Sequence, residues 1–468
     1  MKNIKRCKRW LPLICVSFAL LVFFGGCKKY LDKKPNIAES VPTTVNELQS
    51  LLESPLMYSS SPSISDLFTN DVYVSDATWQ TNISSASSSD VALAKLYVWS
   101  PDALPYDAGW ITPYQQAIFY SNNVLDQSKF VTDSNTYMAK FNQVKGAALF
   151  YRAFQFYQLA QLFCKPYSST ADTDPGIVLR LTSNINETST RSTVAGTYNR
   201  IIGDFKRAAE LLPSTVSSAT RPSVTAAYAA LARVYLNMRD YNNAMTYADL
   251  ALKLNSSLMD YNSLVPVATP PIQQLNTETI FYSGGPAAVL LTSSNAKIDL
   301  SLYQSYEAND LRKTVFFATN TGANAGTYGF RGSYKGGTSS TSVFDGLATD
   351  ELYLIRAECS ARGGDLNSAM NDLNALLIKR YKQGSFIPLT ATSNDDALTK
   401  ILFERRKELI FRAIRWSDIR RLNLEGANIT LSRQIAGTTY TLTPNNPRYL
   451  LPIPFDVINR SGIAQNPR

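Results

Sequence analysis

The chain has 468 residues, and 46 Lys and Arg against 37 Asp and Glu give it a formal net charge of +9. It contains no histidine, which excludes His-based catalytic triads, His general bases and most zinc and iron sites. Apolar residues make up 45% of the sequence, enough for a large core, and the length alone allows two or three domains.

Residues 1–26 have the three parts of a secretory signal peptide. A basic start precedes the uncharged run from Trp10 to Phe24, and Gly25 and Gly26 supply the small residues of a cleavage site. The run is shorter than the ~20 apolar residues of a comfortable membrane span. A plain signal peptide and a short amino-terminal anchor are the alternatives to a lipoprotein signal.

Cys27 directly follows the two glycines, and this arrangement resembles a bacterial lipobox, although Phe24 stands where Leu is more usual. The resemblance implies that the Cys27 thiol is lipidated and becomes the new amino terminus. Several acyl chains anchor a protein stably, at ~0.8 kcal/mol per buried methylene. Residues 27–45 then form a polar, proline-containing tether.

Removal of residues 1–26 leaves 41 basic and 37 acidic residues, a net charge of only +4. This weak balance gives no electrostatic case for a nucleic-acid partner, which needs a clustered basic face. Beyond Cys27, only Cys164 and Cys359 remain, so at most one disulfide is possible.

Helical periodicity dominates most of the mature chain. Thr44 and Glu47 form a capping box before an apolar face at Leu48, Leu51 and Leu52. Residues 55–110 are rich in Ser, Asp, Pro and Tyr, which predicts long loops and short helices, where binding residues tend to lie. Further helices are expected over residues 111–126, 145–163 and 197–212.

Two segments have the spacing of tetratricopeptide repeats. In residues 221–255 two helices joined by MRDY carry small and aromatic residues at the repeat offsets, and residues 351–377 hold a looser copy. Because each repeat needs neighbours to bury its faces, the helices at 145–163 and 197–212 are expected to supply another pair. A generic helical bundle is the alternative.

Seven blocks, in order, resemble the SusD/RagB family: Cys27-Lys28-Lys29-Tyr30-Leu31-Asp32 followed by Pro35, then AALFYRAFQFYQLAQLFCKPY, TADTDPGIVL, RPSVTAAYAALARVYLNMRDYNNAMTYADLAL, DELYLIRAECSARGGDLNSAMNDLNALL, ERRKELIFRAIRWSDIRRLN and YLLPIPFDVINRSGIAQNPR. The resemblance implies an all-α, tetratricopeptide-based, SusD-like fold on the outer face of the outer membrane. It also implies a partner, a SusC-like TonB-dependent barrel over which the lipoprotein acts as a lid that captures glycan.

The resemblance divides the chain into five parts. They are the signal peptide 1–26, the tether 27–45, an N-terminal region 46–220 with a loop-rich ligand face, the repeat 221–255, and a C-terminal region 256–468 with an insertion at 265–347 and a further repeat at 349–422. Arg412-Ala413 stands where many members carry Glu-Gly. We expect Glu408 and Arg412 to form an i, i+4 ion pair on a helix, with Leu409, Ile410, Ala413 and Trp416 facing a core.

Sugar recognition needs aromatic faces and polar partners, so aromatic residues in loops are the candidates for ligand binding, whereas Trp110 leads into a helix and is expected in the core. Each loop aromatic could instead be a packing residue. The candidate ligand-binding residues are Asp76, Trp79, Asn82, Trp99, Tyr106, Tyr328, Phe330, Arg331 and Tyr334.

Catalysis is not expected, because no acid stands in a recognisable glycosidase motif and repeat surfaces more often bind than cleave. A repeat scaffold for protein partners, or binding of a peptide or glycopeptide, is the alternative function, and a glycoside hydrolase is the more remote one. Asp172 and Asp174 faintly suggest a calcium loop, but a turn is favoured. No cofactor and no metal are expected.

Overall fold

The computed structural model describes residues 41–285, 287–336 and 343–468. The signal segment, Cys27 and most of the tether lie outside the described residues. Residues Thr43–Arg468 form one compact unit. Within the described residues, every helix is too short or too polar to cross a membrane.

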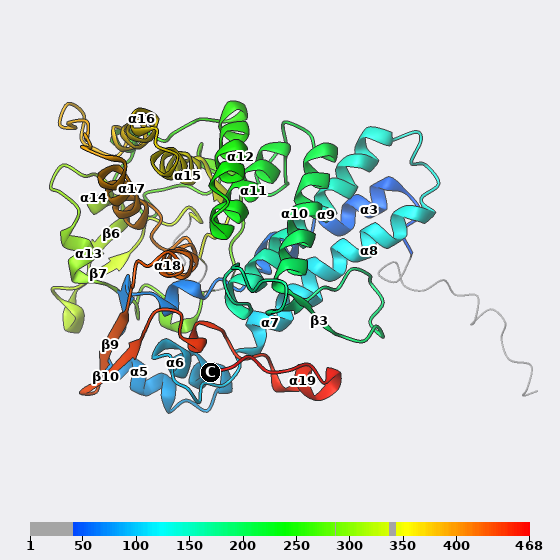
Figure 1. The fold of residues 1–468 in the computed structure, drawn as a ribbon, viewed down its shortest axis with the longest axis horizontal. Helices are drawn as coiled ribbons and strands as arrows, with labels where there is room; N and C mark the ends of the chain where they lie inside the picture. The colour runs from blue at the N-terminus through cyan, green and yellow to red at the C-terminus, as the bar shows by residue number, and fades with distance from the viewer. Residues whose placement is uncertain (1–40, 286, 337–342) are drawn as a thin grey trace, which may run out of the picture. The chain divides into compact units, whose positions relative to one another are not determined.

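Three helix pairs make the framework of this unit, and Figure 1 shows them side by side. The first pair is α9 (Met138–Phe163) with α10 (Val194–Leu211), the second is α11 (Val224–Met238) with α12 (Tyr241–Leu254), and the third is α15 (Thr349–Arg362) with α16 (Leu366–Leu377). Helix α10 packs on α11 and α12 packs on α15, so the pairs form one array. The helices expected over the two repeat segments and over 145–163 and 197–212 are present and pack in pairs.

Small side chains explain the close approach of α11 and α12. Ala244, Ala248 and Ala251 are fully buried along α12, and the facing helix is rich in buried alanines. Ser223 and Asp240 accept hydrogen bonds from backbone N–H groups at the two helix starts. The local sequence therefore sets both the helix ends and the distance between the helices.

The part of the chain before α9 consists of short elements, as the composition of residues 55–110 predicts. Helix α3 (Val45–Leu52) begins with the expected capping box of Thr44 and Glu47. The other elements are α4 (Leu56–Ser59), η3 (Ser65–Phe68), α5 (Asp76–Ile83), α6 (Ser88–Tyr97), α7 (Asp107–Pro113), the π-helical segment η4 (Tyr114–Ile118), α8 (Phe119–Gln127) and η5 (Ser128–Phe130). Trp110 is buried, as expected.

All strands of the described residues pair in two-stranded antiparallel ladders. These are β1 (Val72–Tyr73) with β5 (Lys297–Ile298), β2 (Pro175–Val178) with β3 (Arg191–Thr193), β4 (Thr279–Phe281) with β8 (Leu347–Ala348), β6 (Phe317–Thr319) with β7 (Tyr328–Phe330), and β9 (Leu431–Ile435) with β10 (Thr438–Leu442). The fold is therefore mostly helical, as predicted.

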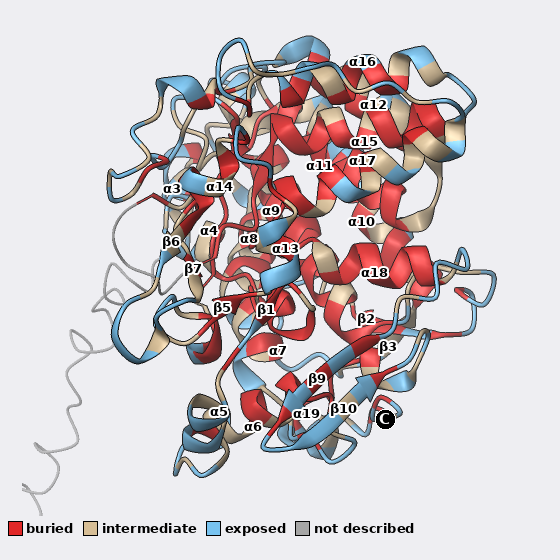
Figure 2. Ribbon diagram, turned by 90° about the vertical axis from the view of Figure 1, so that its left-hand side faces the viewer, coloured by how far each residue is buried: buried red, intermediate tan, exposed pale blue. Residues whose placement is uncertain are grey.

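The remaining helices of the C-terminal half are mostly short, apart from the 15-residue α17 (Asn394–Glu408). They are η6 (Tyr261–Ser263), η7 (Val289–Leu291), α13 (Leu300–Gln304), α14 (Arg312–Phe316), η8 (Gly322–Asn324), α17, α18 (Arg415–Asn423), η9 (Pro447–Tyr449) and α19 (Phe455–Ser461). Figure 2 shows that buried residues run through the helical array while the outer loops are mostly exposed.

The expected ion pair between Glu408 and Arg412 is wrong. Helix α17 ends at Glu408, and Phe411 and Ala413 have φ values of 54° and 56°, so the chain leaves the helix before Arg412. The Arg412 guanidinium instead lies 3.0 Å from the Asp350 carboxylate. The burial of Leu409, Ile410 and Trp416 is confirmed, whereas Ala413 is only half-buried.

Cys164 and Cys359 are both buried free thiols, and burial raises the pKa of each to about 12. Asp174 accepts hydrogen bonds from Lys165 and from the Thr170 hydroxyl, which is the arrangement of a turn. No group of three or more Cys, Asp or Glu able to hold a metal ion is found within the described ranges.

Candidate functional site

Strand β5 brings together three segments that carry partly exposed aromatic residues. It pairs with β1 and also packs against β7, and helix α13 follows it directly. The Asp299 N–H donates to the Asp71 carbonyl at 2.9 Å and extends the β1–β5 pairing. These elements lie next to one another in Figure 2.

Tyr73 is turned outward by strand alternation. Val72 and Val74 on either side of it are buried, while Tyr73 is 38% exposed. Burial and the nearby charge of Asp299 raise the pKa of Tyr73. The Tyr73 ring is therefore partly open to solvent beside β5.

Tyr303 and Tyr328 form a stacked pair on the same surface. Their ring centroids lie 3.5 Å apart with an interplanar angle of 14°, and both side chains are half-buried. The Lys313 ammonium lies 5.0 Å from the Tyr303 centroid, a cation–π contact. Burial and the contact with the Tyr328 hydroxyl raise the pKa of Tyr303.

Trp79 lies on α5, which begins three residues after β1, and its side chain is half-buried. The indole N–H donates to the Ala94 carbonyl at 2.9 Å, which holds the ring in one orientation. Asp76 is exposed in the first turn of this helix. Helix α5 packs mainly against α6, so we call only Tyr73, Tyr303 and Tyr328, which lie on the elements around β5, the aromatic face.

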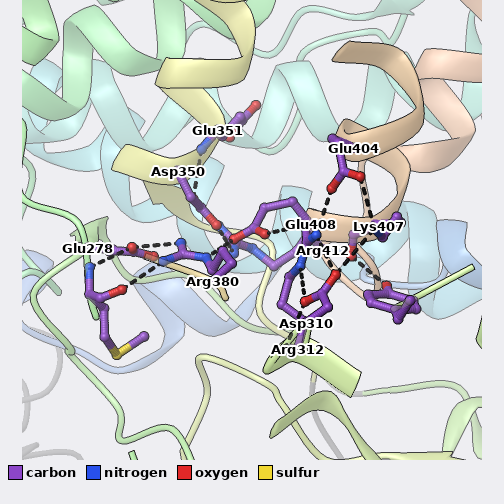
Figure 3. Close-up of polar contacts among 12 residues, drawn as sticks. Glu278, Asp310, Arg312, Asp350, Glu351, Arg380, Glu404, Lys407, Glu408 and Arg412 are labelled. Atoms are coloured by element: carbon purple, nitrogen blue, oxygen red, sulfur yellow. Dashed lines mark hydrogen bonds and ion pairs between the residues drawn. The ribbon is translucent and has the colours of Figure 1, made fainter. Parts of the chain in front are cut away.

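A buried ionic network holds the segment that carries Tyr303 and Tyr328 (Figure 3). Arg312, on α14 between the two tyrosines, has a fully buried side chain. Its guanidinium lies 2.7 Å from Asp310, 2.6 Å from Glu404 and 3.0 Å from Glu408. Since Glu404 and Glu408 belong to α17, this arginine ties the aromatic segment to the helical array.

Other members of the network extend it on both sides of Arg312. Arg380 lies 2.7 Å from both Glu408 and Glu278, and the Tyr306 hydroxyl donates to the Lys407 carbonyl at 2.7 Å. Burial alone would raise the pKa of Asp310, but Arg312 and Lys407 hold it below its ordinary value. Asp310 therefore stays ionised in a region without exposed surface. At the other end of the network, burial raises the pKa of Glu278 to about 7 although Arg380 opposes this shift.

Two of the candidate residues are enclosed in the core. Trp99 is 1% exposed, its indole N–H donates to the Phe68 carbonyl, and Arg433 lies 4.6 Å from its ring centroid. Tyr334 is 2% exposed, and its hydroxyl donates to Glu278 and lies 3.3 Å from the Asp350 carboxylate. Neither ring has a face open to a ligand, so neither can stack on a sugar.

Most of the remaining candidate residues make contacts within the protein. The Phe330 ring stacks on Phe411 at 4.6 Å, and the Arg331 guanidinium donates to the Thr314 carbonyl at 2.6 Å. Asn82 is buried and donates to the Thr78 carbonyl. Tyr106 is half-buried at the start of α7. The structure thus brings Tyr328 close to Phe330 and Arg331, but Tyr106 belongs to a different helix start.

Sequence reasoning missed Tyr73 and Tyr303. The alternation in NDVYVSD, with valines on both sides of the tyrosine, could have indicated that Tyr73 points outward. Tyr303 lies in a short helix, and only its stacking on Tyr328, 25 positions later in the chain, makes it part of the site. No local sequence pattern predicts the contact between Tyr303 and Tyr328.

Two family models match the chain. Residues 29–236 match a SusD-like family described as starch-binding and associating with the outer membrane, and residues 349–468 match the SusD family. SusD-like protein P2 of Formosa agariphila is 27% identical over 409 residues, which cover 74% of this chain and 77% of that protein.

Solved structures have the same fold. A SusD superfamily protein from Bacteroides thetaiotaomicron aligns with a TM-score of 0.72 at 22% identity, covering 91% of this chain and 100% of that one. A SusD-like carbohydrate-binding protein from Bacteroides vulgatus has a TM-score of 0.66 at 21% identity, covering 90% and 97%. A laminarin-binding SusD-like protein has a TM-score of 0.64 at 17% identity, covering 91% and 100%.

These matches extend over both halves of the chain and agree with the helical array described above. The SusD family is a non-catalytic family of glycan-binding proteins, so the chain is not an enzyme. The chain belongs to the SusD/RagB family.

Proposed function

We propose that this protein is a cell-surface lipoprotein that captures oligosaccharides on the aromatic face. The observation that carries the proposal is the stacked, half-buried pair of Tyr303 and Tyr328. A pyranose ring presents apolar C–H groups that pack on such rings, and rigid aromatic side chains lose little conformational entropy when they bind.

Polar groups beside the rings supply hydrogen bonds to sugar hydroxyls. The ammonium group of Lys313 contacts Tyr303. Trp79 and the exposed Asp76, both on α5, are proposed as an outer part of the site. The Arg312 network holds the tyrosines on a rigid support, which favours binding without a rearrangement of the protein. Phe330 and Arg331, next to Tyr328 in the chain, are proposed as secondary contacts.

The proposed site delivers its ligand to a SusC-like TonB-dependent barrel in the outer membrane, with the protein held there by a lipid on Cys27. Support comes from the lipobox-like sequence before Cys27 and from the description of the matching family, which names starch binding and association with the outer membrane. A scaffold or a peptide-binding lipoprotein is the second candidate, favoured by the repeat helices, whose surfaces often bind proteins.

Affinity electrophoresis in gels containing starch or laminarin tests the proposal, since these polymers are named for the family model and for one structural relative. The native protein should migrate more slowly in at least one polysaccharide gel, and Tyr328→Ala should remove that retardation. Tyr247→Ala is the matched control, because Tyr247 is also a half-buried stacked tyrosine but lies on α12.

Retardation that persists in Tyr328→Ala would place the glycan elsewhere. No retardation across a broad glycan panel, together with retention of peptides, would support the second candidate. For the delivery step, solubilised membranes should yield a TonB-dependent barrel that copurifies with the tagged protein, and its absence from crosslinked samples would contradict the partnership.

A further inference from the structure

A second concave site lies away from the aromatic face, between the α7–η4–α8 segment, the loop after β2 and helix α19. The cavity has a volume of about 530 Å³. Its lining includes Trp110, Ile111, Ile118 and Val178, so the walls are largely apolar. Small-molecule sites typically enclose about 300–1,000 Å³ with this kind of lining.

The helix along one wall is irregular at this point. Residues Tyr114–Ile118 form a π-helical segment between α7 and α8, and Tyr114, Gln115 and Ile118 all line the cavity. Such segments are rare and occur frequently at functional sites. The Tyr114 hydroxyl donates to the Val178 carbonyl at 2.6 Å, which fixes this wall to β2.

One polar group of the described cavity lining, on Arg180, is buried without a hydrogen-bond partner. Arg180 donates through Nη2 to Ser189, but its buried Nη1 has no hydrogen-bond partner, because Glu187 Oε2 lies 4.0 Å away. Among the described lining residues, Arg180 and Arg460 are the basic ones and Asp456 is the acidic one. The lining therefore carries one more basic than acidic side chain and has an unfilled hydrogen-bond donor, with Glu187 beside it in a loose ion pair to Arg180 at 4.0 Å.

One apolar lip of the cavity is uncovered. Ile185, in the loop after β2, is 79% exposed although it lines the cavity. A bound apolar group that covers Ile185 would remove apolar surface from water, which is favourable.

We propose that this cavity binds a small amphiphilic anion, a molecule with an apolar ring body and one carboxylate or sulfonate group. The ring body lies against Ile118, Val178 and Ile185, and the anionic group accepts a hydrogen bond from Arg180. The site is separate from the aromatic face, and its existence does not depend on glycan binding.

A pair of fluorescent probes that differ in one charge tests this inference. 8-Anilinonaphthalene-1-sulfonate carries an anionic group, and N-phenyl-1-naphthylamine has the same rings without it. The purified chain carrying Cys27→Ala should bind the sulfonate saturably and about tenfold more tightly than the neutral probe, because a hydrogen bond to a charged group contributes ~1.5–3 kcal/mol.

The variants then locate the site. Arg180→Gln should remove the preference for the anion, and Ile185→Asp, at an exposed position, should weaken sulfonate binding about tenfold. If Arg180→Gln lowers the melting temperature, Arg460→Gln, at an exposed position of the lining, replaces it and should reduce the preference for the anion. Tyr328→Ala should leave the affinity for both probes unchanged. Equal affinity for the two probes in the native protein, or binding unchanged in Arg180→Gln and Ile185→Asp, would overturn the inference.

Discussion

Arg312 has no exposed surface, yet it carries a full charge and contacts three carboxylates. Burying a charge is unfavourable unless partners compensate it, and here Asp310, Glu404 and Glu408 all do so. Neutralising the arginine alone would leave these carboxylates uncompensated in the core. The single residue therefore controls how firmly α14 and the tyrosines around it are held.

Arg312→Met should lower the free energy of unfolding by about 3–5 kcal/mol, the range for breaking a buried ion pair from one side. Arg207→Met is the matched control, because Arg207 pairs with Glu210 on an exposed helix face and should change stability by less than about 1 kcal/mol. Urea unfolding followed by circular dichroism measures both. Equal effects of the two substitutions would show that the network does not stabilise the fold.

Asp66 predicts a pH dependence of stability. Its carboxyl is buried and accepts a hydrogen bond from the Ala413 N–H at 3.0 Å. Burial is the main cause that raises its pKa to about 7, and Asp71 and Asp345 nearby add to it. Because the folded state holds the proton more tightly than the unfolded chain, the contribution of Asp66 is present at low pH and is lost as the pH rises toward 7.

Asp66→Asn keeps the shape of the side chain but removes this titration. The unfolding free energy of the native protein should fall relative to Asp66→Asn between about pH 4 and pH 7, by at most ~1.4 kcal/mol per pH unit. Urea titrations of both proteins at matched pH values measure the difference. A constant difference across this range would contradict the raised pKa.

At the level of elements, the sequence predicted what depends on local periodicity. The alanine spacing in residues 221–255 and the capping box at Thr44 indicated helices that the structure contains. The segment after Glu408 reads as helical too, but Phe411 and Ala413 adopt positive φ because Arg412 is drawn to Asp350, 62 positions earlier in the chain. Such long-range contacts have no local signature.

In the candidate site, too, local sequence patterns were predictive and long-range contacts were not. Loop composition drew attention to Tyr328 and Trp79, which are partly exposed, and equally to Trp99 and Tyr334, which are buried. A Gly- and Ser-rich neighbourhood indicates a loop, but the exposure of a ring depends on what packs over it, here Arg433 on Trp99 and Arg412 on Tyr334. Those arginines come from distant segments.

Two glycines near α10 give opposite predictions. A Cβ on Gly176 would lie 2.3 Å from both the Thr193 carbonyl oxygen and the Thr197 hydroxyl, so Gly176→Ala should destabilise by about 1–3 kcal/mol. Gly203, inside α10, has nothing within 4 Å of the added atom, so Gly203→Ala should stabilise by about 0.5–1 kcal/mol. Thermal or urea unfolding distinguishes them, and a stabilising Gly176→Ala would refute the close β2–α10 contact.

At the level of the whole molecule, attachment to the membrane is proposed to depend on Cys27, outside the described residues. Cys27→Ala should move the protein from the membrane fraction to the soluble fraction, because the lipid is the proposed anchor. Immunoblots of fractionated cells measure the distribution, with Cys164→Ala as the control for loss of a buried thiol. An unchanged membrane fraction for Cys27→Ala would refute lipidation at this residue.

Isothermal titration calorimetry of one retained oligosaccharide measures whether the aromatic face binds glycan. Tyr303→Ala and Tyr328→Ala should each raise the dissociation constant about tenfold, since each ring removes apolar area from the contact. The double variant should lose less binding free energy than the sum of the losses in the two single variants, because the rings stack on each other. Native affinity in both single variants, with Tyr247→Ala equally unaffected, would contradict the account.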